Sequence, residues 1–118
     1  MDLTPQDSDT VILVTNNGMG TSDTDLQHKL ISTYLQLLNE NNYLPALICF
    51  YTEGVKLTVE GSPVLTELKA LENKGVRLVI CGTCLNYFGI QDQVKVGLPG
   101  GMTDIIEAQW RAKKVITL

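Results

Sequence analysis

The sequence is short of the cations and histidines on which several classes of function depend. It contains 1 histidine, and its 9 Lys and Arg residues are outnumbered by 13 Asp and Glu residues, which gives a net charge of -4. Proteins that bind nucleic acid neutralise its phosphates with clustered Lys and Arg. The charge balance therefore argues against nucleic acid and against an anionic membrane as partners, and a lone histidine gives no basis for a Ser-His-Asp arrangement.

Long hydrophobic runs are also lacking. No apolar run approaches the roughly 20 residues that span a bilayer, and residues 1–9 lack the charged and apolar regions of a signal peptide. We therefore expect a cytoplasmic protein. The length of 118 residues and the apolar fraction of 44% predict a single domain over residues 1–118, with residues 1–9 as a flexible N-terminal segment.

Cysteine is scarce, and the number of cysteines is odd. Three cysteines in a chain without an export signal predict free thiols and not a disulfide framework. Cys49 lies in the apolar run 46–51, where a cysteine usually acts as a small buried hydrophobe. Cys81 and Cys84 form a Cys-x-x-Cys pair and need a different explanation.

Short apolar runs alternate along the chain with segments of helical periodicity. We predict strands over residues 10–15, 44–52, 76–80, 93–97 and 115–118, and helices over residues 24–41, 64–74, from 83 onward and 102–113. Residues 98–101 are expected to form a loop, and Thr103 or Asp104 to cap the last helix. Strands that alternate with helices pair in parallel through right-handed crossovers. The predicted fold is α/β, a three-layer α/β/α sandwich with a mainly parallel five-stranded sheet.

The cysteine pair lies where a strand gives way to a helix. Cys81 directly follows the strand predicted over 76–80, and the next helix opens at Thr83. In open parallel sheets ligands bind outside the carboxyl ends of the strands, and free amides at a helix N-terminus favour thiolate over thiol. Cys81 is therefore the predicted reactive thiol, with the amides of Gly82 and Thr83 stabilising its charge. Cys84, one helical turn away, is the second candidate catalytic residue.

Several interpretations of the pair stay open at this point. A pair of this spacing can cycle between dithiol and disulfide, as in thioredoxin-like redox proteins. The pair can also consist of two inert, packed thiols. A zinc site fits less well, because structural zinc takes four ligands and the other candidates are Cys49 and His28, which we expect on a solvated helix face. We predict no metal.

Two glycine-bearing loops are candidate ligand sites. Residues 16–23 follow the first strand, where a doubly wound fold binds phosphate or FMN at a helix N-terminus; an ordinary tight turn is the other interpretation. Residues 96–102 precede the last helix at the edge predicted for the cysteines, and they form either a wall of amides beside an anionic sulfur species or a flexible connector. The predicted pocket residues are Asn16, Gly18, Gly82, Thr83, Gly101 and Met102. We expect no organic cofactor.

Four segments of the chain, residues 54–58, 75–90, 104–107 and 114–116, resemble the DsrE-like sulfur-relay family, and most closely the carboxy-terminal domain of the YedF-type selenium-metabolism proteins. The resemblance covers nearly the whole chain, and its specific part is the segment 81–90. It implies that the cysteine after the third strand, here Cys81, carries sulfur as a persulfide. It gives no role to Cys84, which either resolves a persulfide or packs.

The resemblance also implies partners. Many members of the family form oligomers, so we expect at least a homodimer. YedF-type proteins usually join this domain to an amino-terminal sulfur-carrier domain, and this chain begins a few residues before its first strand, so we expect a separate protein to supply that carrier. Where relatives have a Ser-Asn-Met run, this chain has Pro99-Gly100-Gly101-Met102, which points to a different ligand or partner.

The residues and the resemblance together predict a sulfurtransferase-like persulfide carrier that works through Cys81 and handles sulfur or selenium. Two rivals from other classes stay open. One is a non-enzymatic module that binds an anion, a nucleotide or a protein partner in its cleft, with incidental thiols. The other is a thiol-disulfide redox protein that uses both Cys81 and Cys84.

Overall fold

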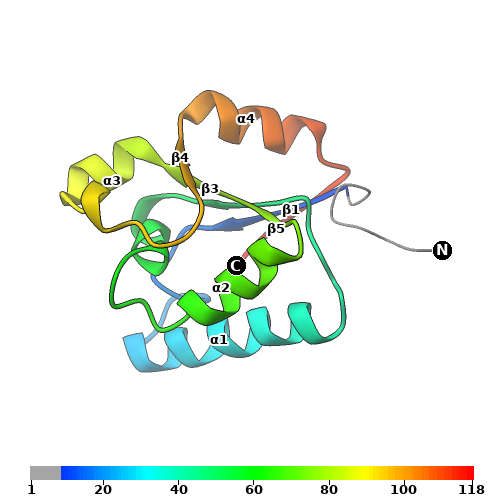
Figure 1. Cartoon of the computed structure of the whole chain (residues 1–118), viewed down its shortest axis with the longest axis horizontal. Helices are drawn as coiled ribbons and strands as arrows, with labels where there is room; N and C mark the ends of the chain where they lie inside the picture. Colours follow the sequence, from blue (N-terminus) through cyan, green and yellow to red (C-terminus); the bar gives the residue numbers. More distant parts are fainter. Residues whose placement is uncertain (1–8) are drawn as a thin grey trace.

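The computed structural model describes residues 9–118, which form a five-stranded parallel sheet with helices on both faces (Figure 1). The sheet order is β4-β3-β2-β1-β5, and every pairing is parallel. The strands are β1 (Thr10–Val14), β2 (Leu47–Phe50), β3 (Arg77–Cys81), β4 (Leu98–Gly100) and β5 (Lys114–Thr117). The predicted α/β class and the predicted five-stranded sheet are confirmed.

The helices divide between the two faces and one edge of the sheet. In Figure 1, α1 (Thr24–Glu40) and α2 (Leu65–Asn73) lie on one face, and α4 (Met102–Arg111) lies on the other. The short helix α3 (Gly82–Phe88) continues from β3 beyond the carboxyl ends of the strands. Two 3-10 helices, η2 (Thr52–Thr58) and η3 (Gln91–Gln93), complete that edge.

The core lies on both sides of the central strands. Val11, Ile12, Leu13 and Val14 of β1 are all buried, which is why this strand is a continuous apolar run and does not alternate with polar residues. On the face of α1 and α2 the core is completed by Ile31, Leu35, Leu68 and Leu71, and on the face of α4 by Ile105 and Ala108. The periodicity of these helices thus follows from the sheet that they cover.

The fourth strand differs from the sequence prediction. The predicted strand over 93–97 is wrong, and the segment 98–101 expected as a loop contains β4. Leu98, Pro99 and Gly100 pair with Val79, Ile80 and Cys81 of β3. β4 is an edge strand, so the missing amide of Pro99 removes no hydrogen bond from the middle of the sheet. Pairing with β3, and not local propensity, makes these residues a strand.

The second strand is also shorter than predicted. β2 ends at Phe50, and residues 52–58, expected as the end of the strand and a loop, form η2. Gly54 of η2 packs so closely against the end of β1 that a Cβ atom there would overlap the carbonyl oxygen of Val14. The chain therefore turns sharply after Tyr51 and returns toward β1, which a continuous strand would prevent.

The starts of two helices also differ from the sequence prediction. α3 begins at Gly82, not at Thr83, so Cys81 is at once the last residue of β3 and the N-cap of α3. α4 is capped at Gly101, not at Thr103 or Asp104. The amide of Gly101 donates a hydrogen bond to Asp104 Oδ2 at 2.9 Å, so Asp104 acts as the acidic residue of the first turn.

The predicted flexible segment over residues 1–9 lies outside the described residues, except for Asp9. The carbonyl oxygen of Asp9 accepts hydrogen bonds from the amides of Lys113 and Lys114, which ties the start of β1 to the start of β5. Within residues 9–118, none of the helices combines the length and the apolar character needed to cross a membrane.

The close approach of Gly54 to Val14 gives a stability prediction. Gly54→Ala should lower the free energy of unfolding by about 3 kcal/mol, because the new methyl group meets backbone that cannot move aside. Gly101→Ala is the matched control, because a Cβ atom at Gly101 would meet open space and its φ of -98° suits any residue. Denaturant unfolding measures both variants, and equal stabilities would contradict the packing described here.

Candidate functional site

The carboxyl ends of β1, β2 and β3 meet at one edge of the sheet, where the two cysteines of the pair lie. Cys81 ends β3, and Cys84 lies one turn into α3. Thr15 and Thr52 follow β1 and β2 at the same edge. The parallel pairing of all three strands makes this convergence necessary.

Cys81 is enclosed by its neighbours. It is 2% exposed, and it pairs in register with Gly100 of the edge strand β4. A Cβ atom at Gly82 would lie 3.5 Å from the carbonyl oxygen of Gly100, so the cysteine junction and the loop before α4 are in close contact. The structure thus confirms that the loop leading to Gly101 shares an edge with the cysteines.

Cys84 is half-buried. Its sulfur accepts a hydrogen bond from the backbone N–H of Thr52 at 3.1 Å. It lies one turn along α3 from Cys81, which is the N-cap of that helix, and both thiols are free. The two cysteines of the sequence pair are therefore neighbours in the structure as well.

The surroundings of Cys84 act on its pKa in opposite directions. Burial raises the pKa of the Cys84 thiol, and the neighbouring Cys81 raises it further. The Thr52 amide lowers it, because an N–H donor stabilises the thiolate. The net effect is a raised pKa, so at neutral pH Cys84 holds its proton more firmly than a free thiol does.

Thr52 has an unusual backbone. Its φ of 49° is in the left-handed region, which is a rare conformation for a β-branched residue and costs about 1–3 kcal/mol. The side chain holds this conformation, since the hydroxyl of Thr52 donates to the carbonyl oxygen of Thr15 at 2.6 Å and also lies 2.7 Å from that of Tyr51. The amide that faces Cys84 is therefore fixed in place.

Thr52 was not among the residues that the sequence suggested. It ends a run that reads as a strand, and nothing in a threonine predicts a left-handed backbone. The local signal is Gly54, which marks a turn two residues later but does not single out Thr52. Its position depends on contacts with β1 and α3 that are distant in the sequence.

Cys49 belongs to a different environment. It lies in β2 beside Val79 of β3 and is fully buried. Burial raises the pKa of Cys49 to about 11. This agrees with the structural role expected for it, because a thiol that is both inaccessible and protonated does not react.

The loop after β1 has the contacts of a packed turn. Gly18 is buried, and a Cβ atom there would overlap Gln27 of α1. The amide of Met19 donates to the carbonyl oxygen of Gln27 at 3.1 Å, and Gln27 Nε2 donates to that of Gly20 at 2.6 Å. These contacts favour the interpretation as an ordinary turn over an FMN or phosphate loop.

The other predicted pocket residues lie at the cysteine edge. Gly82 is half-buried, and Thr83, Gly101 and Met102 are exposed. The link from Asn16 to the cysteines is indirect, since its neighbour Thr15 accepts the hydroxyl of Thr52. The role of these residues as pocket walls stays a prediction.

His28 is not on a fully solvated face as expected. It is half-buried, with Nε2 3.4 Å from Asn17 Oδ1, because the loop after β1 folds back over α1. Within the part of the chain that the structure describes, no group of three or more His, Cys, Asp and Glu side chains is arranged to hold a metal ion.

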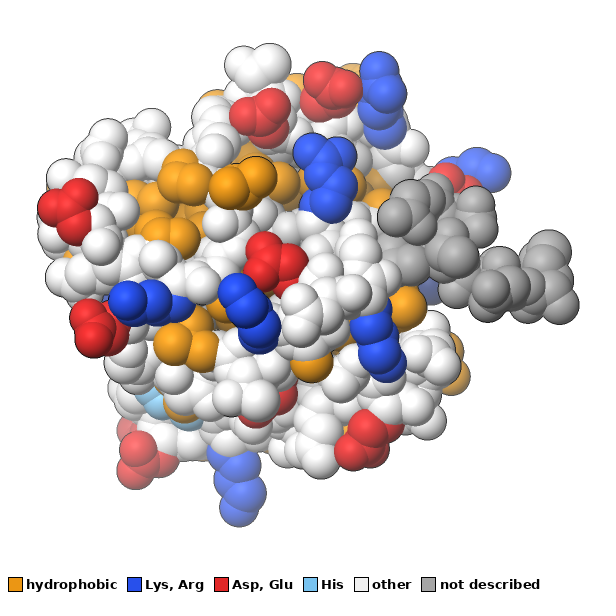
Figure 2. Space-filling view, in the orientation of Figure 1, with side chains coloured by type: hydrophobic (Ala, Val, Ile, Leu, Met, Phe, Trp, Pro, Cys, Tyr) orange, Lys and Arg blue, Asp and Glu red, His pale blue; other side chains and the backbone are white. Residues whose placement is uncertain are grey.

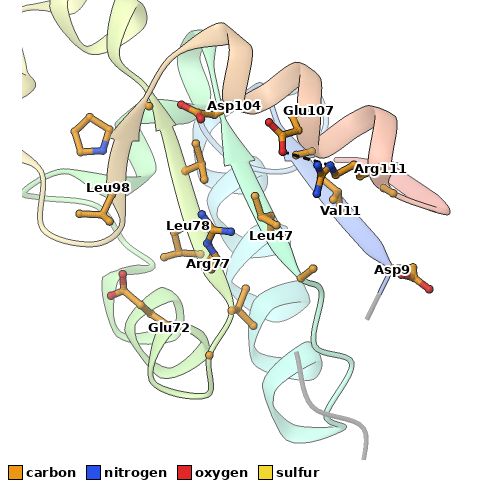
Figure 3. Close-up of a pocket in the computed structure, with 18 residues that line it drawn as sticks. Asp9, Val11, Leu47, Glu72, Arg77, Leu78, Leu98, Asp104, Glu107 and Arg111 are labelled. Carbon is orange, nitrogen blue, oxygen red and sulfur yellow. Dashed lines mark ion pairs between the residues drawn. The ribbon is translucent and has the colours of Figure 1, made fainter. Parts of the chain in front are cut away.

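A separate cavity of about 860 Å³ lies between α4 and the sheet (Figure 3). Arg77 projects from β3 in its middle, and Glu107 and Arg111 of α4 form an ion pair at 3.3 Å along one side. The remaining charged residues of the lining are Asp9, Glu72 and Asp104. Neither Cys81 nor Cys84 lines this cavity, so the cysteine edge and the cavity are distinct candidate sites.

Comparisons with known proteins agree on the fold. Residues 9–118 match the sequence model of the DsrE/DsrF-like family. Among solved structures, the YchN protein of E. coli is similar with a TM-score of 0.72 at 18% identity over 94% of this chain and 99% of that one. The search of curated proteins found no match.

Two further structures with a similar fold are of proteins of unknown function. MTH1491 from Methanobacterium thermoautotrophicum has a TM-score of 0.65 at 18% identity over 92% of this chain and 97% of that one. BT1422 from Bacteroides thetaiotaomicron has a TM-score of 0.67 at 16% identity over 99% of this chain and 100% of that one. At these identities the likeness concerns the fold alone.

The contacts of Cys84 predict how its reactivity changes when Cys81 is replaced. Cys81→Ser removes the thiol and the charge that raise the pKa of Cys84, so the alkylation rate of Cys84 against pH should shift to lower pH. Iodoacetamide labelling, with the modified residue located by peptide mass spectrometry, measures the profile. Buried Cys49 is the internal control and should stay unlabelled until the protein unfolds. A profile that stays in place or moves to higher pH would show that the two thiols do not interact.

Proposed function

Because the chain belongs to the DsrE/DsrF-like family, we propose that it relays sulfur, with Cys81 carrying the sulfur atom as a persulfide. The observation that carries this proposal is the position of Cys81 at the carboxyl end of β3, one helical turn from a second free thiol. Two neighbouring free thiols at the ligand-binding edge of a parallel sheet suit thiol exchange.

The chemistry is an exchange in which no net oxidation occurs. The Cys81 thiolate attacks the outer sulfur of a donor persulfide, the donor S–S bond breaks, and the donor leaves as a thiol. A reverse exchange passes the sulfur to an acceptor thiol. The burial of Cys81 limits the access of water to the bound sulfur, which favours a carrier over a general reductant. This reaction is sulfurtransferase-like and draws on protein thiols alone.

The resemblance of the cysteine segment to YedF-type proteins extends the proposal in two directions. Selenium can replace the outer sulfur in the same exchange, so the proposed carrier can handle selenium as well as sulfur. The partner that supplies or receives the atom is a sulfur carrier with its own reactive cysteine.

The rival function, binding of an anion or nucleotide with incidental thiols, would use the cavity under α4. Its lining contains the carboxylates of Asp9, Glu72, Asp104 and Glu107 against the guanidinium groups of Arg77 and Arg111. The excess of negative charge disfavours an anionic ligand. The two cysteines also lie one helical turn apart at the same sheet edge, which favours a joint role for the thiols over an incidental one.

Exposed apolar side chains support the expected homo-oligomer. Met102, Ile106 and Trp110 are spaced by four residues along one face of α4, and Trp110 is 85% exposed. Figure 2 shows hydrophobic side chains gathered over β4, between α3 and α4. β4 is also an edge strand that pairs with Cys81 through Gly100. We therefore propose an oligomer whose interface adjoins the cysteine edge.

The persulfide proposal is tested by incubating the protein to completion with glutathione persulfide under anaerobic conditions. Intact mass should rise by one sulfur atom in the wild type and in Cys84→Ser, and fragmentation of the tryptic peptide 78–95 should place that atom on Cys81. The double variant with Cys81→Ser and Cys84→Ser is the control and should gain nothing. If the wild type gains no sulfur on Cys81, Cys81 is not a sulfur carrier.

The interface is tested by sedimentation of matched variants on the two faces of the molecule. The wild type should sediment well above the mass of the 13.0 kDa chain. Ile106→Glu on α4 should shift it toward the monomer, because a buried, unpaired carboxylate is costly. Leu30→Glu on α1 is the control, since Leu30 is 43% exposed and Ile106 is 47% exposed. A monomeric wild type, or equal effects of the two substitutions, would refute this interface.

A further inference from the structure

We infer that sulfur reaches Cys81 through Cys84, and that Thr52 is the residue that positions Cys84 for this transfer. The inference rests on the proposed function, because it takes Cys81 as the final carrier. It adds an entry thiol and a positioning residue, and it gives the second cysteine of the pair a defined task.

The two thiols differ in access. Cys81 is 2% exposed and pairs with the edge strand β4, so a donor persulfide reaches its sulfur less readily than that of Cys84, which is half-buried. A donor therefore meets Cys84 first. Cys81 is the N-cap of α3 and Cys84 is the third residue of that helix, so the carrier thiol lies one turn from the entry thiol.

A backbone hydrogen bond also positions the Cys84 sulfur. The Thr52 amide donates to it at 3.1 Å, and Thr52 is exposed, so core packing does not account for its left-handed conformation. The hydroxyl of Thr52, at 2.6 Å from the Thr15 carbonyl oxygen, holds this conformation. Strained residues that are fixed in this way mark sites where geometry serves a function.

The relay consists of two exchanges. In the first, the Cys84 sulfur attacks the outer sulfur of the donor persulfide, the donor S–S bond breaks, and the donor leaves as a thiol with the proton that Cys84 gives up. In the second, the Cys81 sulfur attacks the outer sulfur of the Cys84 persulfide, and Cys84 leaves. The proton of Cys81 passes to Cys84, so the products are the Cys84 thiol and the Cys81 persulfide. Atoms and charge balance, and no oxidant or reductant is consumed.

Thr52 acts on the second exchange. The S–S bond between Cys84 and its outer sulfur breaks with negative charge developing on the Cys84 sulfur, and a better-stabilised leaving thiolate departs faster. The Thr52 amide already faces that sulfur, as donors face the oxygen in an oxyanion hole.

The rate of loading tests the entry role. In an anaerobic time course with glutathione persulfide, the wild type should gain one sulfur on Cys81, Cys81→Ser should retain it on Cys84, and Cys84→Ser should load Cys81 roughly tenfold more slowly or worse, since the accessible thiol is gone. Cys49→Ala replaces a cysteine buried in β2 and should load at the wild-type rate.

Two other outcomes of this time course would contradict entry through Cys84. Loading of Cys84→Ser at the wild-type rate shows direct entry at Cys81, and a Cys81–Cys84 disulfide with release of hydrosulfide shows that Cys84 discharges the sulfur. Both results leave Cys81 as the carrier. A wild type that gains no sulfur on Cys81 at completion removes the proposed function itself, so the two failures are distinguishable.

The role of Thr52 is tested with Thr52→Val and Thr52→Ser. Valine keeps the shape but removes the hydroxyl anchor, and it should slow loading roughly tenfold, below the 10²–10³ typical of deleting an oxyanion-hole donor, because the amide is displaced and not deleted. Serine keeps the hydroxyl and should restore the rate.

The pH dependence of Cys84 alkylation in a Cys81→Ser background distinguishes a positioning role of Thr52 from a merely structural one. Without its donor the Cys84 thiolate is less stable, so Thr52→Val should move the profile to higher pH and Thr52→Ser should leave it in place. Identical profiles and identical loading rates for valine and serine would overturn the role of Thr52, whatever their effect on unfolding.

Discussion

Parallel pairing of every strand is the constraint on which the cysteine site depends. Because β1, β2 and β3 run in the same direction, their carboxyl ends meet at one edge, which brings Thr15, Thr52 and Cys81 together from distant parts of the sequence. The hydroxyl of Thr52 then ties the end of β2 to the end of β1. Burial of the sheet on both faces holds the strands in register, so the geometry at the edge follows from the core beneath it.

The environment, and not the Cys-x-x-Cys spacing, distinguishes the two thiols. Cys81 is enclosed by β3, β4 and the first turn of α3, whereas Cys84 is partly accessible and receives a backbone donor. Burial, and then the neighbouring Cys81, raise the pKa of the Cys84 thiol. A division of labour between an inner carrier and an outer thiol fits these differences better than a symmetric redox couple does.

The sequence predicted those parts of the structure that local patterns determine. The apolar run 10–15 and the periodicity of 24–41 identify β1 and α1, because each pattern reflects the face or faces that the element buries. The run that ends before Cys81 likewise placed this residue at a strand end. β4 escaped prediction because a three-residue edge strand with Pro99 and Gly100 has no strand propensity of its own, and its pairing with β3 creates it. Thr52 was not predicted for a related reason, because its left-handed backbone conformation depends on a contact with the end of β1.

A crystal structure of the wild-type protein after exposure to inorganic polysulfide tests the central claim, that Cys81 holds the sulfur, most directly. The account predicts one additional sulfur atom bonded to Cys81 Sγ at about 2.05 Å, with Cys84 reduced and the Thr52 amide still directed at its sulfur. A disulfide between Cys81 and Cys84, or an additional sulfur on Cys84 while Cys81 remains a free thiol, would contradict it.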